Sequence, residues 1–225
     1  MFRNLLEKAS NAVNYVISSD KITDPEYDAA EQELKKLSLE TDKIIGYLIK
    51  LQTHLEKLSR TSANLGEDVD KWFIDAPQES KLKAKTFLSV GKHFDALTVN
   101  FLHPRLEPHV ISILSNYQAE VLNMEKVKKD RKKALDKYQK TLSAKDATED
   151  QKAKDREEYE KLNQEFITNV KSLSERRAKE LEIPFRNFTC IMSQYLMQVF
   201  TEIQKFRTTF PPELFQKDEP KNAAE

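Results

Sequence analysis

The sequence has little of what folds with many tight turns require. Its 225 residues include three glycines and one cysteine, and 39% of them are hydrophobic. So few glycines exclude the turn chemistry of a β-sandwich or a β-barrel. The single cysteine, Cys190, excludes an internal disulfide, favours a reducing compartment and is expected in the core. Long apolar runs are also missing, since no stretch approaches the roughly 20 apolar residues of a transmembrane helix.

Neither sign of charge is in excess. The chain has 37 basic and 37 acidic residues, so its net charge of zero points to no particular partner. Charged residues still make up 33% of the chain, which leaves more surface than core. This composition predicts an elongated, mostly helical protein.

A heptad pattern predicts a long first helix. From Tyr27 to Trp72, positions spaced alternately by three and four residues are mostly large and apolar, as in a coiled coil. Asp24 is expected to cap this helix, with Pro25 at the first helical position, where proline is favoured. Residues 75–77, Asp-Ala-Pro, end it.

Two further long helices follow, over about residues 80–142 and 148–208. Pro104 and Pro108 predict a bend or break in the second helix, because proline removes a backbone donor and clashes with the preceding turn. Pro184 predicts a kink in the third helix for the same reason.

Short polar connections join the three helices, so neighbouring helices are expected to run antiparallel. In the second connection, residues 143–150, Thr148 is the expected helix cap. The sequence therefore predicts an all-α fold, an elongated three-helix antiparallel coiled-coil bundle with kinked helices, over residues 21–210. An amphipathic helix precedes it in residues 1–20, and residues 211–225 are expected to be a disordered tail.

Aromatic residues gather on the half of the bundle that is far from the second connection. Their number exceeds what three helices can bury, so this half is predicted to form a dimer interface. If the kinks lie at a common level, the dimer would be a crescent with two thin arms. The predicted interface residues are Phe87, Phe94, Phe101, Phe185, Phe188 and Tyr195.

The first 18 residues have one apolar face at helical periodicity. Two interpretations stay open: a helix that lies in a membrane interface and separates headgroups, or a helix that folds back and caps the bundle. Charged residues within the segment argue against a signal peptide. The apolar face consists of Phe2, Leu5, Leu6, Ala9, Val13, Val16 and Ile17.

Basic residues concentrate in one part of the second helix. Between Lys126 and Lys140 there are eight bases and two acids, whereas acids outnumber bases thirteen to eight between Asp20 and Asp75. On a helical wheel, five lysines lie opposite a packed side expected to contain Leu135, Tyr138 and Leu142. We call these five the lysine row: Lys126, Lys129, Lys133, Lys137 and Lys140.

Further lysines continue the charge around the second connection and along the third helix. Lys145, Lys152 and Lys154 surround the connection, and Lys161 shares an outer face with Lys154. Arg131 falls near the packed side and is expected to be an internal partner for acids of the first or third helix.

Three interpretations of the lysine row remain at this point: an anionic lipid surface, nucleic acid, or a solvated face without a ligand. No aromatic residues alternate with the row, which disfavours specific recognition of single-stranded nucleic acid. Catalytic and metal signals are weak, because no cluster of His, Cys or carboxylates has ligand spacing and Gly91-Lys92 lacks the rest of a phosphate-binding loop. The sequence predicts no enzyme, no metal and no cofactor.

Three local motifs, in this order and spacing, resemble the BAR domain superfamily, and most nearly the N-BAR type of amphiphysins, yeast amphiphysin-like proteins and endophilins. The resemblance covers residues 1 to about 208. Its motifs are Asp24-Pro25-Glu26-Tyr27, the basic run 128–133 followed by Asp136 and Tyr138, and 159–163 followed by Leu173 and Pro184-Phe185.

The resemblance implies a crescent-shaped antiparallel homodimer, or a heterodimer with a paralogue, that binds anionic phospholipid membranes. The lysine row and Lys145, Lys152, Lys154 and Lys161 would then meet lipid, and residues 1–18 would insert. The implied function is sensing and generation of membrane curvature, including tubulation, in endocytosis or membrane trafficking, by a cytoplasmic protein peripheral on the plasma or endosomal membrane. No nucleic acid and no small-molecule substrate are implied. The alternative is a dimeric coiled-coil scaffold that does not touch lipid.

Overall fold

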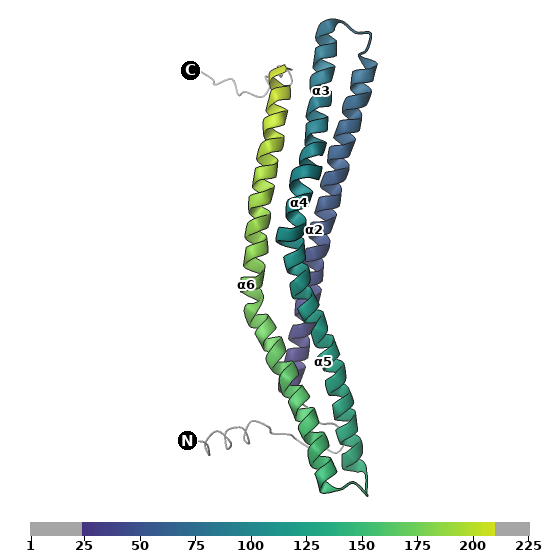
Figure 1. Cartoon of the computed structure of the whole chain (residues 1–225), viewed down its shortest axis with the longest axis vertical. Coiled ribbons are helices and arrows are strands. Elements are labelled where there is room, and N and C mark those ends of the chain that lie inside the picture. Colours follow the sequence, from purple (N-terminus) through teal and green to yellow (C-terminus); the bar gives the residue numbers. More distant parts are fainter. Residues whose placement is uncertain (1–23, 210–225) are drawn as a thin grey trace, which may run out of the picture. The chain divides into compact units, whose positions relative to one another are not determined.

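The structure, a computed structural model, describes residues 24–209 (Figure 1). The expected N-terminal helix in residues 1–20 and the tail after residue 210 lie outside the described residues. Between residues 24 and 209 the chain forms helices and turns without any strand, which confirms the predicted all-α class. In chain order the elements are the α-helices α2 (Pro25–Trp72) and α3 (Gln78–Leu97), the π-helical turn η1 (Thr98–Leu102), α4 (His103–Leu106), the π-helical turn η2 (Glu107–Ile111), α5 (Ser112–Ser143) and α6 (Glu149–Thr209).

Both predicted helix caps are present. Asp24 Oδ1 accepts the backbone N–H groups of Glu26 and Tyr27 at 3.1 and 3.0 Å. Thr148 Oγ1 accepts the N–H of Gln151 at 3.2 Å. These bonds satisfy donors that the first turn of a helix leaves without an internal partner, so α2 and α6 begin where their side chains can cap them.

Of the bend or break predicted at the two prolines, the break does not occur. From α3 to α5 the chain stays helical, and it passes Pro104 and Pro108 through the two π-helical turns. The N–H of His103 reaches the carbonyl of Thr98, and that of Ser112 reaches the carbonyl of Glu107, each five residues back. The wider turns accommodate the missing proline donors without ending the helix.

The chain divides into two compact units. Unit 1 holds the start of α2 up to Thr41 together with Gln118–Ala178, which comprises most of α5 and the first half of α6. Unit 2 holds Asp42–Tyr117 and the part of α6 after Ala178. Each unit thus contains a segment from each of the three long helical stretches, and α6 runs through Pro184 as one helix.

Unit 2 has a core of aliphatic side chains from all three stretches. Within it, the hydroxyls of Thr98 and Tyr195 are 2.8 Å apart and form a buried hydrogen bond. Burial raises the pKa of the Tyr195 phenol above its ordinary value. Tyr195 is 1% exposed in a single chain, so it belongs to the core and its assignment to a dimer interface was wrong. The buried core residues are Ile45, Leu48, Leu97, Leu102, Leu106, Val110, Ile111, Leu114, Ile191 and Tyr195.

Gly91 allows α2 and α3 to pack closely. A Cβ at this position would lie 2.6 Å from the carbonyl oxygen of Ser62, which is backbone and cannot rotate away. On α2, one helical turn after Ser62, a Cβ at Gly66 would lie 2.8 Å from the Cα of Leu88 on α3. Gly66 and Gly91 therefore allow α2 and α3 to approach closely, and Gly91 is not part of a phosphate-binding loop.

The heptad pattern overstates how much of α2 a single chain buries. Leu34, Leu37 and Leu48 are buried, but Leu58 and Leu65 are 55% and 53% exposed. The expectation of a core cysteine was also wrong, because Cys190 is exposed. The next residue on α6, Ile191, is the one that points into the core. Neighbouring side chains on a helix are rotated by about 100° from each other, so Cys190 points away from the core.

Candidate functional site

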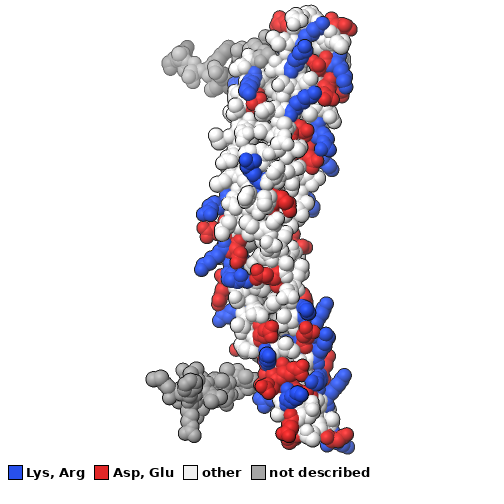
Figure 2. All heavy atoms as spheres, viewed as in Figure 1, with Lys and Arg blue, Asp and Glu red and all other residues white. Residues whose placement is uncertain are grey.

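All five residues of the lysine row are exposed on α5. Their spacing of three and four residues keeps them on neighbouring positions of one helix face. Lys145 in the connection and Lys154 and Lys161 on α6 are exposed as well, whereas Lys152 is half-buried. Figure 2 shows that basic side chains on the face drawn stand among acidic ones. Pairing therefore decides how much positive charge is available.

Three of the nine candidate lysines have an acidic partner. Lys133 Nζ lies 3.0 Å from Asp130, and Lys152 Nζ lies 2.8 Å from Glu149. Lys137 Nζ contacts two carboxylates of α6. Within residues 24–209, the other six have no ion pair: Lys126, Lys129, Lys140, Lys145, Lys154 and Lys161.

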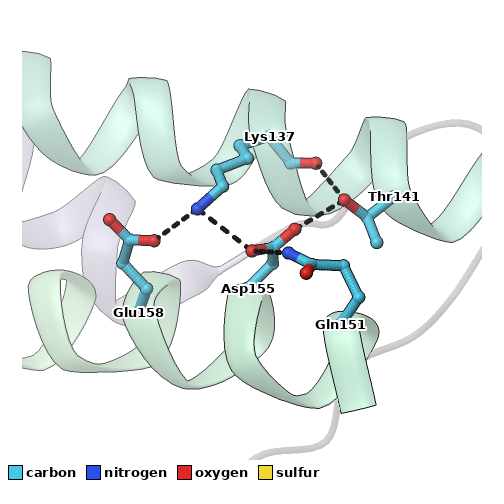
Figure 3. Close-up of polar contacts among 5 residues, drawn as sticks. All are labelled: Lys137, Thr141, Gln151, Asp155 and Glu158. Carbon is cyan, nitrogen blue, oxygen red and sulfur yellow. Dashed lines mark hydrogen bonds and ion pairs between the residues drawn. The ribbon is translucent and has the colours of Figure 1, made fainter. Parts of the chain in front are cut away.

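The two acids at Lys137 belong to a network that joins α5 to α6 (Figure 3). Lys137 Nζ donates to Glu158 at 2.8 Å and lies 3.0 Å from Asp155. The buried carboxylate of Asp155 also accepts from the Thr141 hydroxyl at 2.6 Å and from the Gln151 amide at 2.9 Å. Lys137 is thus a structural clamp between the two helices as well as a surface charge.

The pKa values of this network follow from its hydrogen bonds. The Thr141 hydroxyl, then Gln151 and Lys137, lower the pKa of Asp155 from 3.8 to about 2. The hydrogen bonds to Glu158 and Asp155 raise the pKa of Lys137. Both groups therefore stay charged across the physiological pH range, and the clamp does not open by titration there.

The described part of α2 begins level with the middle of α5. Past that level only α5 and α6 remain among the described residues, and the polar clamp at Lys137 joins these two helices. Tyr27 lies against Arg131, the guanidinium carbon being 3.3 Å from the ring centroid. Beyond that level, toward the connection, the described residues form a hairpin of α5 and α6 alone. Two helices bury less than three, so Leu142 is 47% exposed and the expectation that it packs was wrong. Tyr138, stacked on Tyr159 with centroids 6.1 Å apart, is half-buried as expected.

Arg131 is internal, as the sequence predicted, but its direct partners are not acids. It is 5% exposed and donates to Asn163 Oδ1 at 2.6 Å and to the Tyr159 hydroxyl at 3.1 Å. Asn163 in turn donates to Asp24 at 2.6 Å. Only the tertiary structure brings Arg131, Asn163 and Asp24 together, because they lie on α5, on α6 and at the cap of α2, and no local pattern links them.

A second surface of interest is an apolar face of unit 2. A groove of about 390 Å³ runs between α2, α3 and α6, and its lining includes the heptad residues Leu58 and Leu65. Beside it, α6 exposes four large apolar side chains. Phe200 belongs to the aromatic half that the sequence predicts to form an interface, whereas the other three were omitted, although the run Tyr-Leu-Met-Gln-Val-Phe at 195–200 contains two of them. The four side chains are Leu196 (55% exposed), Met197 (70%), Phe200 (60%) and Ile203 (49%).

The aromatic residues predicted for a dimer interface differ in exposure. Phe185 is 41% exposed, and Phe87, Phe94, Phe101 and Phe188 are half-buried. Phe87 packs on Phe206, with ring centroids 5.4 Å apart. These side chains therefore leave part of their surface outside the core of one chain.

Residues 24–209 contain no group of three or more His, Cys, Asp or Glu residues arranged to hold a metal ion. In the same range, no helix combines the length and apolar character that crossing a bilayer requires.

Comparison with protein-family models and with curated proteins gives no match. Among solved structures, the chain is similar to the N-terminal I-BAR domain (residues 1–259) of IBARa from D. discoideum, with a TM-score of 0.45 and 15% sequence identity. The likeness covers 88% of this chain and 95% of that one. It concerns an I-BAR domain, so the N-BAR type remains a prediction from the sequence motifs.

Proposed function

We propose that this chain binds anionic phospholipid membranes through the α5–α6 hairpin and acts, as a dimer of the N-BAR type, in sensing and generating membrane curvature. It catalyses no reaction in this proposal. It would work at the cytoplasmic face of the plasma or endosomal membrane, in endocytosis or membrane trafficking.

The observation that carries the proposal is the set of six lysines without an ion pair on the α5–α6 hairpin of unit 1. Between Lys126 and Lys161 the chain has thirteen bases and nine acids, so this region is positive although the whole chain is neutral. A lysine near an anionic leaflet contributes about 1 kcal/mol. Six such residues facing one leaflet would contribute about 6 kcal/mol in each chain, and a dimer would double this.

Two further parts complete the proposal. The apolar face of unit 2 would be covered by a second copy of the chain or by a paralogue, because large exposed apolar patches mark interaction surfaces. Residues 1–18, with apolar Phe2, Leu5, Leu6, Ala9, Val13, Val16 and Ile17 on one side, would insert into the leaflet.

Co-sedimentation with vesicles tests the central claim. The chain should pellet with phosphatidylserine vesicles at low salt, much less at 1 M salt, where charges are screened beyond about 3 Å, and not with phosphatidylcholine vesicles. Reversing three unpaired lysines of the row should abolish pelleting. The variant is Lys126→Glu with Lys129→Glu and Lys140→Glu.

Lys133 and Lys137 are left out of this variant because changing them would also break ion pairs. A matched control reverses three exposed lysines of unit 2 that form no ion pair within residues 24–209, namely Lys57, Lys85 and Lys179. The control should pellet far better than the row variant. If the row variant pellets as well as the unmodified chain, the lysine row does not bind lipid. If the unmodified chain itself does not pellet with phosphatidylserine vesicles, the lipid-independent scaffold is favoured.

The dimer is tested separately by sedimentation velocity. Met197→Glu with Phe200→Glu places two charges on the exposed apolar face of α6, and the chain should become monomeric. Since both side chains are mostly exposed in one chain, the fold should be kept. A dimer that survives this variant would show that the contact lies elsewhere.

A further inference from the structure

Three hydroxyl side chains lie at or beside the connection between α5 and α6. Thr141 is half-buried, and its hydroxyl donates to the buried Asp155 carboxylate at 2.6 Å. Thr148 is exposed, but its oxygen caps α6, and acids follow it at the next two positions. Ser143, the last residue of α5, is exposed, and within residues 24–209 its hydroxyl bonds only to the carbonyl of Gln139, at 2.9 Å on the same helix. Of the three, Ser143 is therefore the hydroxyl that serves neither interhelical packing nor capping.

Bases flank Ser143 on both sides. Lys140 precedes it by three residues and Lys145 follows it by two. Both belong to the six lysines that form no ion pair within residues 24–209. A spacing of three residues makes Lys140 and Ser143 neighbours on the surface of α5. Protein kinases recognise their substrates in part by such charge patterns. The pattern here suits a serine kinase that selects a base on each side of its target.

The backbone of the connection can be opened at little cost. Backbone hydrogen bonds within it are long, at 3.4 Å from the N–H of Ala144 to the carbonyl of Thr141 and at 3.5 Å from the N–H of Ala147 to the carbonyl of Ala144. Leu142, directly before Ser143, is 47% exposed. Segments with few buried contacts and solvent-exposed hydrogen bonds open locally at low free-energy cost. A kinase can therefore bind this stretch as an extended peptide while the core of unit 1 stays folded.

We propose that Ser143 is a phosphorylation site for such a base-directed serine kinase, and that its phosphate weakens the attachment of the α5–α6 hairpin to anionic lipid. The kinase transfers the γ-phosphoryl group of ATP to the serine oxygen, the hydroxyl proton is released, and ADP leaves. The effect on lipid rests on the proposed function and adds to it a means of releasing the chain from the membrane.

The size of the effect follows from charge. A phosphoserine carries a charge of about −1.5 to −2 at neutral pH. Between Lys126 and Lys161 there are thirteen bases and nine acids, so the phosphate removes about half of the local excess of four. Its oxygens can also accept hydrogen bonds from Lys140 and Lys145. Two of the six unpaired lysines are then withdrawn from lipid, which corresponds to an about 30-fold weaker Kd.

The hairpin should keep its fold when Ser143 is phosphorylated. A negative group at the C-terminal end of a helix opposes the helix dipole, but this effect is confined to the last turn. The ion pairs of Lys137 with α6 lie more than one turn earlier on α5. Circular dichroism of the phosphorylated chain should therefore match that of the unmodified chain, and any loss of vesicle affinity then reflects charge.

The first test locates the phosphate. The full chain is incubated with ATP and a serine kinase that selects lysine or arginine three residues before and two residues after its target, and mass spectrometry identifies the modified residue. Phosphate should appear on Ser143, and Lys140→Gln with Lys145→Gln should lose most of the incorporation. Lys85→Gln with Lys179→Gln, two exposed lysines of unit 2, is the matched control and should lose none. Phosphate only at other residues, or equal incorporation in both double variants, would overturn the site.

The second test measures the Kd for phosphatidylserine vesicles before and after phosphorylation. The phosphorylated chain should bind about 30-fold more weakly. Kinase-treated Ser143→Ala should bind like the untreated chain. Ser143→Asp adds one negative charge and should weaken binding about fivefold. Ser89→Asp adds the same charge at an exposed serine of unit 2 and should leave the Kd nearly unchanged.

The outcomes separate this inference from the proposed function. An equal Kd with and without phosphate on Ser143 would overturn release by phosphorylation while lipid binding by the hairpin stands. Equal losses in Ser143→Asp and Ser89→Asp would overturn it as well, because the position of the added charge would then be irrelevant. Absence of vesicle binding by the unmodified chain would instead overturn the proposed function and release from lipid together, and the first test alone would then decide whether Ser143 is a phosphorylation site.

Discussion

A charge-neutral substitution provides the sharpest prediction about the lysine row. Lys133 has Asp130 at 3.0 Å, whereas Lys126 and Lys129 have no acidic partner among the described residues. Replacing the pair by Lys133→Gln with Asp130→Asn removes one positive and one negative charge from the same place. Replacing Lys126 and Lys129 by Gln removes two positive charges and no negative one.

The expected difference can be worked from these contacts. Each unpaired lysine near an anionic leaflet contributes about 1 kcal/mol, so the Lys126/Lys129 variant loses about 2 kcal/mol per chain. That is a roughly 30-fold weaker Kd. The Lys133/Asp130 variant leaves the local net charge as it was, and its vesicle affinity should stay within about twofold. The exposed ion pair contributes only about 0–1 kcal/mol to stability, so the fold is kept.

The assay is a titration of each chain with phosphatidylserine–phosphatidylcholine vesicles at two salt concentrations. The two variants should differ most at low salt and converge as salt rises, since screening weakens the lysine contribution. Equal loss of affinity in both variants would refute the reasoning. It would mean that individual side chains, rather than local net charge, determine binding.

Three other predictions concern packing, pH and reactivity. Gly91→Ala should lower the unfolding free energy by about 1–3 kcal/mol in thermal or urea unfolding, because its Cβ would lie 2.6 Å from the Ser62 carbonyl oxygen. Gly46→Ala is the matched control, because no atom lies within 4 Å of the added Cβ. It should stabilise α2 by up to about 1 kcal/mol. If Gly46→Ala destabilised the protein, that result would contradict the packing account. The pKa of Asp155 is lowered from 3.8 to about 2, so the charged carboxylate stabilises the fold above about pH 4. This contribution to the unfolding free energy should disappear as pH falls toward 2. Acid-unfolding curves of Asp155→Asn should lack that loss. Cys190, which is exposed, should react with a thiol reagent in the native monomer nearly as fast as in urea, and strong protection would contradict its placement.

The charged surface shows how far the sequence could predict the candidate site. The exposure of the lysine row follows from helical periodicity alone, and the pairing of Lys133 with Asp130 follows from their spacing of three residues. The contact of Lys137 with Asp155 could not be predicted in this way, because it depends on the register of α5 against α6. The same holds for Arg131 and Asn163, whose contact joins positions 32 residues apart.

Burial shows the same division between local and tertiary information. The heptad pattern correctly predicts a long α2, but it cannot say which of its apolar positions one chain covers, and Leu58 and Leu65 remain exposed. Exposed Cys190 and buried Tyr195 were both misassigned because burial depends on which helix lies opposite, not on residue type.

The sequence by itself determined the helices, their caps at Asp24 and Thr148, and the exposed row of lysines. These depend on interactions within one or two helical turns, and residue type and spacing describe such interactions well. Only the tertiary structure decided which lysines are paired, how the chain passes Pro104 and Pro108 as a helix, and which amide holds the start of α2. Those outcomes depend on the register and distance between helices, which are set by the packing of side chains far apart in the chain.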